Sequence, residues 1–226
     1  MATRIGPRPY TIPIATGLIL LWDASDKRSY IPSSSIIYDL AGNYNGTVGA
    51  GCSYSTNGGG SITINGPVAI ISNTSINMTS QKYTAVVATR YTSSNRGRML
   101  TANNNNWLLG HHSNQAEKYY AEGWVSNSSG GPNDTAWRVF TGTGDTTTDN
   151  WKFYVNSELR ASNSAGSQGP NGIVIGSFPP GGRLGGSGDL ENSSGEFSFL
   201  AVYNRVLTEE EILTNYNSIK GRYNLS

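Results

Sequence analysis

Trp151-Lys-Phe-Tyr-Val-Asn156 carries a large apolar residue at every second position, beginning with Trp151 and continuing with Phe153 and Val155. Successive side chains of a β-strand point to opposite faces of the sheet. The alternation therefore predicts a half-buried antiparallel strand that places these three side chains in the core.

Short runs of β-branched and aromatic residues recur along the rest of the chain, separated by clusters of Gly, Asn, Ser, Thr and Pro. This pattern is typical of an all-β fold, because β-branched and aromatic side chains pack well on a pleated surface. The other predicted strands cover residues 18–22, 61–64, 68–71, 83–91, 107–110, 136–141, 172–175 and 196–203.

One helix is predicted near the end of the chain. Thr208 and Glu211 have the spacing of a capping box, in which each side chain binds the backbone N–H of the other residue. Gly221 is expected to end the helix. Apolar residues at helical spacing predict a face that docks on the sheets, namely Ile212, Leu213, Tyr216 and Ile219.

Composition excludes several classes of protein. The chain has 226 residues, of which only 14% are charged, whereas helical bundles and coiled coils are much richer in charge. The net charge is +1 and no basic block is present, so we expect no nucleic-acid partner. The length fits one large β-sandwich, for which about 200–250 residues is usual.

We expect two parts, an extended N-terminal arm over residues 1–16 and a sandwich domain over residues 17–226. Prolines bias the arm to extended conformations, and apolar side chains between them predict contact with a partner. The alternative is a lead-in that packs on its own domain. The arm residues in question are Ile5, Pro7, Pro9, Tyr10, Ile12, Pro13 and Ile14.

Targeting and redox features are sparse. The start of the chain lacks the apolar core of a signal peptide, which predicts synthesis in a host cytoplasm without export. The most apolar run, residues 18–22, is far shorter than the roughly 20 residues of a membrane helix, so no membrane insertion is expected. Cys52 is the only cysteine, so no intrachain disulfide can form.

Three stretches resemble the concanavalin A-like, laminin G-like jelly-roll domains, especially those of bacteriophage and bacterial surface proteins. The first is Gly17-Leu-Ile-Leu-Leu-Trp-Asp-Ala-Ser-Asp26 together with residues 37–47, where Tyr38 stands in place of the usual Trp. The second is residues 151–159, where Ser157 replaces the common turn glycine, and the third is residues 195–212. The resemblance implies a jelly-roll sandwich of two antiparallel sheets with one short C-terminal helix.

Catalytic motifs are missing from the sequence. Hydrolases of this superfamily present their carboxylates as Glu-x-Asp-x-x-Glu, which does not occur here. Glu117 and Glu122 fall on opposite faces of any regular strand, and the pair Asp189 and Glu191 lies in a Gly- and Ser-rich loop. We therefore expect no enzyme activity, and a glycoside hydrolase is the weakest alternative.

Metal sites are weakly indicated. His111 and His112 are adjacent, so on a strand they point to opposite faces and cannot share a metal ion. Asp145, Asp149 and Asn150 offer oxygen ligands suited to Ca²⁺, but turn formation is the better explanation of these residues. No cofactor is predicted, with calcium as the candidate exception.

Carbohydrate binding is the main functional alternative to a structural role. Sugars dock on exposed aromatic faces, while the other interpretation of large aromatic residues is that they fill the space between two sheets. The candidate glycan-binding residues are Trp107, Tyr119, Tyr120, Trp124 and Trp137.

The first hypothesis for function is a non-enzymatic virion structural protein, such as a capsid decoration, fibre or tail-associated module. In this hypothesis the arm binds other virion proteins of the capsid or tail, and the sandwich projects outward. The second hypothesis is a lectin-like adhesion module that recognises host surface glycans. Either function allows a homo-oligomer.

Overall fold

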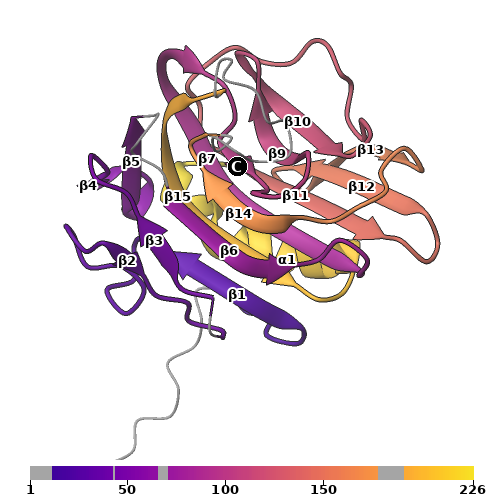
Figure 1. Cartoon of the computed structure of the whole chain (residues 1–226), viewed down its shortest axis with the longest axis horizontal. Coiled ribbons are helices and arrows are strands. Elements are labelled where there is room, and N and C mark those ends of the chain that lie inside the picture. Colours follow the sequence, from indigo (N-terminus) through magenta and orange to yellow (C-terminus); the bar gives the residue numbers. More distant parts are fainter. Residues whose placement is uncertain (1–11, 43, 66–70, 178–190) are drawn as a thin grey trace, which may run out of the picture.

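Two antiparallel sheets face each other across an apolar core (Figure 1). The computed structural model describes residues 12–42, 44–65, 71–177 and 191–226. Sheet A contains, in spatial order, β13 (Glu158–Asn163), β12 (Asn150–Val155), β11 (Arg138–Asp145), β7 (Tyr83–Arg96), β15 (Ser193–Tyr203), β5 (Ser61–Asn65) and β4 (Ser53–Ser55), and β1 (Leu18–Asp23) also pairs with β15. Sheet B contains β10 (Gln115–Ala121), β9 (Trp107–His112), β8 (Leu100–Thr101), β14 (Asn171–Ile175), β6 (Ile71–Asn77), β3 (Gly46–Val48) and β2 (Ile36–Ile37).

The alternation of side chains along β12 decides which residues lie on each of its two faces. Trp151, Phe153 and Val155 are buried between the sheets, as predicted. Tyr154 points to the other face of sheet A and packs in a second apolar cluster with the C-terminal helix. The middle of sheet A is therefore buried on both faces, which explains why all eleven residues of β15 are buried.

The predicted strands that lie in the described residues are confirmed, with shifted ends. Of the predicted strand 68–71, only Ile71 is described, and it begins β6. Several short or polar strands were not predicted, including β2, β4 and β13. Five of the six β13 positions are exposed and none is buried, so this strand has no apolar alternation to reveal it.

Helix α1 (Glu209–Ile219) has the predicted capping box, with both hydrogen bonds between Thr208 and Glu211 present. Leu213 was predicted to dock but is 47% exposed. The prediction that Gly221 ends the helix was wrong, because α1 ends at Ile219 and continues as the 3-10 turn η2 (Lys220–Tyr223). No helix in the described part of the chain is long and apolar enough to cross a membrane.

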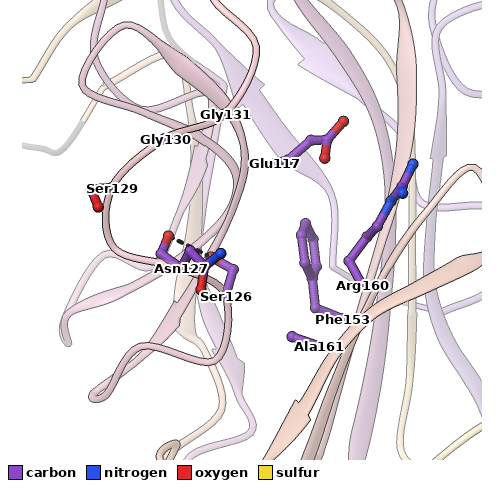
Figure 2. A pocket seen from close by; sticks show the side chains of 9 residues that line it. All are labelled: Glu117, Ser126, Asn127, Ser129, Gly130, Gly131, Phe153, Arg160 and Ala161. Atoms are coloured by element: carbon purple, nitrogen blue, oxygen red, sulfur yellow. Dashed lines mark hydrogen bonds between the residues drawn. The ribbon is translucent and has the colours of Figure 1, made fainter.

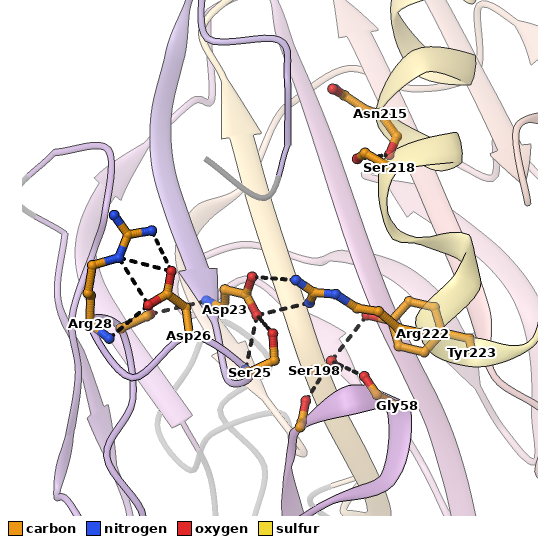
Figure 3. Close-up of polar contacts among 12 residues, drawn as sticks. Asp23, Ser25, Asp26, Arg28, Gly58, Ser198, Asn215, Ser218, Arg222 and Tyr223 are labelled. Atoms are coloured by element: carbon orange, nitrogen blue, oxygen red, sulfur yellow. Dashed lines mark hydrogen bonds and ion pairs between the residues drawn. The ribbon is translucent and has the colours of Figure 1, made fainter. Parts of the chain in front are cut away.

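A buried ion pair joins the end of β1 to η2 (Figure 3). The Asp23 carboxylate is fully buried and accepts two hydrogen bonds from the Arg222 guanidinium, at 3.0 and 2.9 Å. The same carboxylate also accepts from the backbone N–H and hydroxyl of Ser25. The neighbouring pair of Asp26 and Arg28 lies at the surface, with the Arg28 side chain 43% exposed.

His111 is enclosed in the core. Its ring lies 4.4 Å from the ring of Tyr91 and 5.0 Å from the ring of Phe140, and its Nδ1 lies 3.3 Å from the Thr89 hydroxyl. Burial, reinforced by the positive charge of Arg138, lowers the pKa of His111 from 6.5 to about 3. The imidazole is therefore neutral in the folded protein at ordinary pH.

The buried histidine makes stability depend on pH. Because its folded pKa lies below its unfolded pKa, the unfolded chain takes up a proton that the native state rejects, and stability falls as the pH drops from about 6.5 toward 3. Between pH 7 and 5 we expect a loss of about 2 kcal/mol from this group. Urea unfolding of the wild type and of His111→Phe at both pH values tests this. An equal drop in the two proteins would contradict the assignment.

Candidate functional site

Trp124 lies at the edge of sheet B, beside Tyr120 and His112. The chain turns sharply at Glu122, which has a φ of 58°, and returns so that Trp124 forms a β-bridge with Tyr120. The Trp124 ring lies 5.1 Å from the Tyr120 ring and 5.7 Å from the His112 ring, both at steep angles. Both Trp124 and Tyr120 are partly exposed.

The polar side of this site is built around Glu191. Its carboxylate accepts a charge-assisted hydrogen bond from Arg98 and lies 2.9 Å from His112 Nε2. Arg98 is 4% exposed and also donates to the Asn106 side-chain oxygen at 2.8 Å. Burial alone would raise the pKa of Glu191, but the hydrogen bond with His112 and the positive charge of Arg98 outweigh it, so the pKa is lowered.

We name Trp124, Tyr120, His112, Glu191 and Arg98 the Trp124 cluster. It combines aromatic surface with an oriented carboxylate, an imidazole and a buried guanidinium. Glu191 is 32% and His112 19% exposed, so both reach solvent. Such a set suits a ligand that has apolar C–H faces as well as hydroxyl groups.

A cavity of about 290 Å³ opens between β10 and β13, the edge strands of the two sheets (Figure 2). Phe153 and Ala161 line its apolar side, and the loop 126–131 forms the opposite wall. A register shift between Ala116 and Lys118 marks a β-bulge at Glu117, whose φ is 64°. Bulges redirect side chains, and the Glu117 carboxylate here lines the cavity and lies 3.4 Å from Arg138.

Lys118 holds the cavity loop in place. This side chain is buried, and its ammonium donates to the backbone carbonyls of Asn127 and Gly130. Burial lowers the pKa of Lys118. The two carbonyls tie the loop to β10, so the wall of the cavity is a fixed part of the fold.

The prediction of glycan binding was wrong for two of the five candidate residues, Trp107 and Tyr119. Trp107 and Tyr119 have no exposed surface, and their polar atoms bind Tyr83 inside the core, with the Trp107 Nε1 donating at 2.8 Å. A ring enclosed in this way cannot stack on a sugar. Here the interpretation that aromatic residues fill the space between the sheets is the correct one.

Trp137 lies apart from the Trp124 cluster. It is partly buried against the apolar cluster that contains α1, with its ring 5.0 Å from Tyr223 and the Arg90 guanidinium 5.3 Å above it. The structure therefore keeps Tyr120 and Trp124 together and separates them from Trp137.

The candidate calcium ligands have other partners. The Asp145 carboxylate accepts from the backbone N–H of Thr147 and pairs with Lys82 at 3.0 Å. Asp149 accepts from the Trp151 indole, and Asn150 is an exposed first residue of β12. Among the described residues, no group of three or more His, Cys, Asp or Glu side chains could hold a metal ion. Calcium binding stays a prediction.

The described end of the arm packs on its own domain. Ile12 is fully buried and Ile14 partly buried in the cluster around α1, and the Ile14 carbonyl accepts from the Tyr203 hydroxyl. These two side chains are therefore already occupied, whereas Pro13 is exposed. Ile5, Pro7, Pro9 and Tyr10 lie outside the described residues, so the role of the arm stays a prediction.

The acidic pairs considered for catalysis are separated. Glu117 faces the cavity, while the Glu122 carboxylate accepts from the backbone N–H of Asn106. Glu191 belongs to the Trp124 cluster, and Asp189 lies outside the described residues. Sequence reasoning missed that Arg98, His112 and Glu191 meet, because 79 or more residues separate Glu191 from the other two.

Comparisons with known proteins agree with this architecture. The family model described as "Concanavalin A-like lectin/glucanases superfamily" matches residues 43–213. A search of curated proteins gave no match.

Solved structures share the fold at low sequence identity. The binding domain of Paraclostridial Mosquitocidal Protein 1 matches with a TM-score of 0.64 and 17% identity, over 89% of this chain and 52% of that one. A Trypanosoma rangeli sialidase matches with a TM-score of 0.68 and 15% identity, over 98% of this chain and 36% of that one. The receptor binding domain of botulinum neurotoxin type G matches with a TM-score of 0.56 and 15% identity, over 89% and 51%.

This chain thus spans about half of each toxin domain and about a third of the sialidase. The matches confirm the predicted fold. Because the family model covers more than half of the residues, the chain belongs to the concanavalin A-like lectin/glucanase superfamily.

Proposed function

We propose that this protein is a non-enzymatic carbohydrate-binding module that recognises a surface glycan through the Trp124 cluster. The observation that carries the proposal is the partly exposed Trp124, held beside Tyr120 and His112 and next to the carboxylate of Glu191. The aromatic rings offer an apolar surface to the C–H face of a sugar ring. Glu191 and His112 offer directional hydrogen bonds to its hydroxyls.

The rigidity of the polar groups supports this proposal. Arg98 is buried and binds Glu191, Asn106 and Thr101, so the carboxylate is oriented before any ligand arrives. A site that is already ordered loses little conformational entropy on binding. The Arg98 side chain itself is a positioning residue in this proposal, because it is only 4% exposed.

The similar structures are consistent with a recognition role. Two of them are described as binding domains, one of a mosquitocidal protein and one of a neurotoxin, and the sialidase was also solved in complex with sialic acid. We propose that this chain needs no cofactor and acts by binding alone, since the Glu-x-Asp-x-x-Glu motif is absent from its sequence.

A glycan array tests the proposal. We expect the wild type to bind at least one class of surface polysaccharide, and Trp124→Ala to lose that binding. Trp137→Ala is the matched control, because Trp137 is also partly exposed but lies in another part of the molecule. Release of reducing ends from a bound glycan would show an enzyme instead, and an array without hits would contradict the proposal.

The predicted attachment to a virion is a second proposal, which rests on the sequence of residues 1–11. Their two prolines, together with Ile5 and Tyr10, suit an extended segment held by a capsid or tail protein. Deleting residues 1–11 should abolish incorporation into particles and leave glycan binding intact. The deletion stops there because Ile12 and Ile14 pack on the domain. Normal incorporation of the shortened chain would contradict this proposal.

A further inference from the structure

Two charged side chains enter the cavity between β10 and β13 from β-bulges on opposite sheets. The register of β10 with β9 skips Glu117, and the register of β13 with β12 skips Arg160, so each is the extra residue of a bulge. A bulge redirects a side chain, and bulges are common beside active sites. Sheet B thus directs an anion, and sheet A a cation, into one cavity.

Neither charge is strongly held inside the protein. Among the described residues, the ion-pair partner of Glu117 is Arg138, whose Nε lies 3.4 Å away, which is longer than an ordinary hydrogen bond. Asp134 already binds the Arg138 guanidinium at 2.7 and 2.8 Å. Arg160 pairs with Glu158 of its own strand, whose side chain is 70% exposed. Such an exposed pair contributes little to stability, so both charges can turn to a ligand.

The rest of the cavity is small and uncharged. Phe153 and Ala161 form its apolar side, and Ser126, Asn127 and Ser129 line the loop on the other side. Ligand pockets usually measure about 300–1,000 Å³, so a volume of about 290 Å³ suits a ligand of few atoms. The uncharged lining also favours a ligand whose body carries no further charge.

The loop wall keeps its shape without a ligand. The backbone N–H of Tyr119 donates to the Ser126 hydroxyl at 2.9 Å. The buried Lys118 ammonium donates to the carbonyls of Asn127 and Gly130. A ligand that enters this cavity therefore does not have to order the loop, which lowers the entropic cost of binding.

We propose that this cavity binds a free α-amino acid with an uncharged side chain. The ammonium group of such a ligand donates to the Glu117 carboxylate, and its carboxylate accepts from the Arg160 guanidinium, both in charge-assisted hydrogen bonds. A ligand with one charge matches only one of the two bulge residues, whereas a zwitterion matches both. Figure 2 shows both side chains extending past the ring of Phe153, so the ring is left for the body of the ligand.

Calorimetric titration of the full chain with the common α-amino acids, one at a time, tests this proposal. We expect saturable binding of at least one with an uncharged side chain, and Glu117→Gln and Arg160→Gln should each weaken it by about tenfold or more. Acetate and methylamine carry one charge each and should bind at least about tenfold more weakly than the amino acid.

Arg28→Gln is the matched control and should bind like the wild type. The Arg28 side chain is 43% exposed, against 47% for Arg160, and it also pairs with an acidic residue two positions away. Urea unfolding confirms that each variant folds. Arg160→Gln, at an exposed position on an edge strand, decides the outcome if Glu117→Gln does not fold.

Several results would overturn the proposal. One is the absence of saturable binding for every amino acid up to about 10 mM. Others are an affinity that either cavity variant leaves unchanged, binding of amino acids with charged side chains only, or acetate or methylamine that binds as tightly as the amino acid. Loss of methyl glucoside binding in Glu117→Gln, with no amino acid bound, would assign the cavity to a sugar instead.

Discussion

Arg222→Met is expected to lower the free energy of unfolding by about 3 kcal/mol, because it removes the partner of a buried carboxylate. Asp23 has no exposed surface, and its carboxylate accepts two hydrogen bonds from the Arg222 guanidinium. The Arg222 side chain is 19% exposed, and Ser25 still binds the carboxylate when Arg222 is replaced. The loss of unfolding free energy should therefore lie at the lower end of the range measured for broken buried ion pairs. Methionine keeps the aliphatic stem, which isolates the effect of the charge.

The neighbouring surface pair provides the control for this prediction. Arg28→Met removes an ion pair with similar chemistry, but Arg28 is 43% exposed, so we expect a loss below about 1 kcal/mol. Urea unfolding of the three proteins at neutral pH measures both values. Equal losses in the two variants, or an Arg222→Met protein as stable as the wild type, would contradict the assigned role of the Asp23–Arg222 pair.

Trp124→Ala is expected to weaken glycan binding by roughly thirtyfold, which corresponds to about 2 kcal/mol for truncation of a central aromatic contact. The indole is the largest ring of the Trp124 cluster, and no other described tryptophan lies beside Tyr120 and His112. Calorimetric titration with the glycan identified on the array measures the change.

Two further variants show whether the loss comes from the ring itself. Trp124→Phe keeps an aromatic face and should retain part of the affinity, while Trp137→Ala should bind like the wild type. Unchanged affinity in Trp124→Ala would show that the glycan binds elsewhere, with the cavity beside Phe153 as the next site to examine.

The sequence predicted the architecture because the fold depends on local patterns. The alternation of Trp151, Phe153 and Val155 and the capping box of Thr208 and Glu211 both appear in the structure. Strand β4 was missed because it has only three residues, none of them buried. Strand β13 was missed because it is a charged edge strand without a periodic apolar signal.

The candidate site was harder to predict, because it depends on which side chains face solvent. Trp107 and Trp124 look equivalent in the sequence, yet one is fully buried and the other partly exposed. The register of β9 and β10 and the turn at Glu122 decide this difference, and no local pattern reveals either. The contact of Glu191 with Arg98 likewise arises only from the sheet topology.

The most direct test of carbohydrate recognition at the Trp124 cluster is an NMR titration that follows the indole N–H signals of the five tryptophans as glycan is added. We predict a saturable shift of the Trp124 signal, assigned by its absence in Trp124→Phe, while the signals of the core residues Trp22, Trp107 and Trp151 stay in place. Saturable binding that leaves the Trp124 signal unmoved would contradict the account.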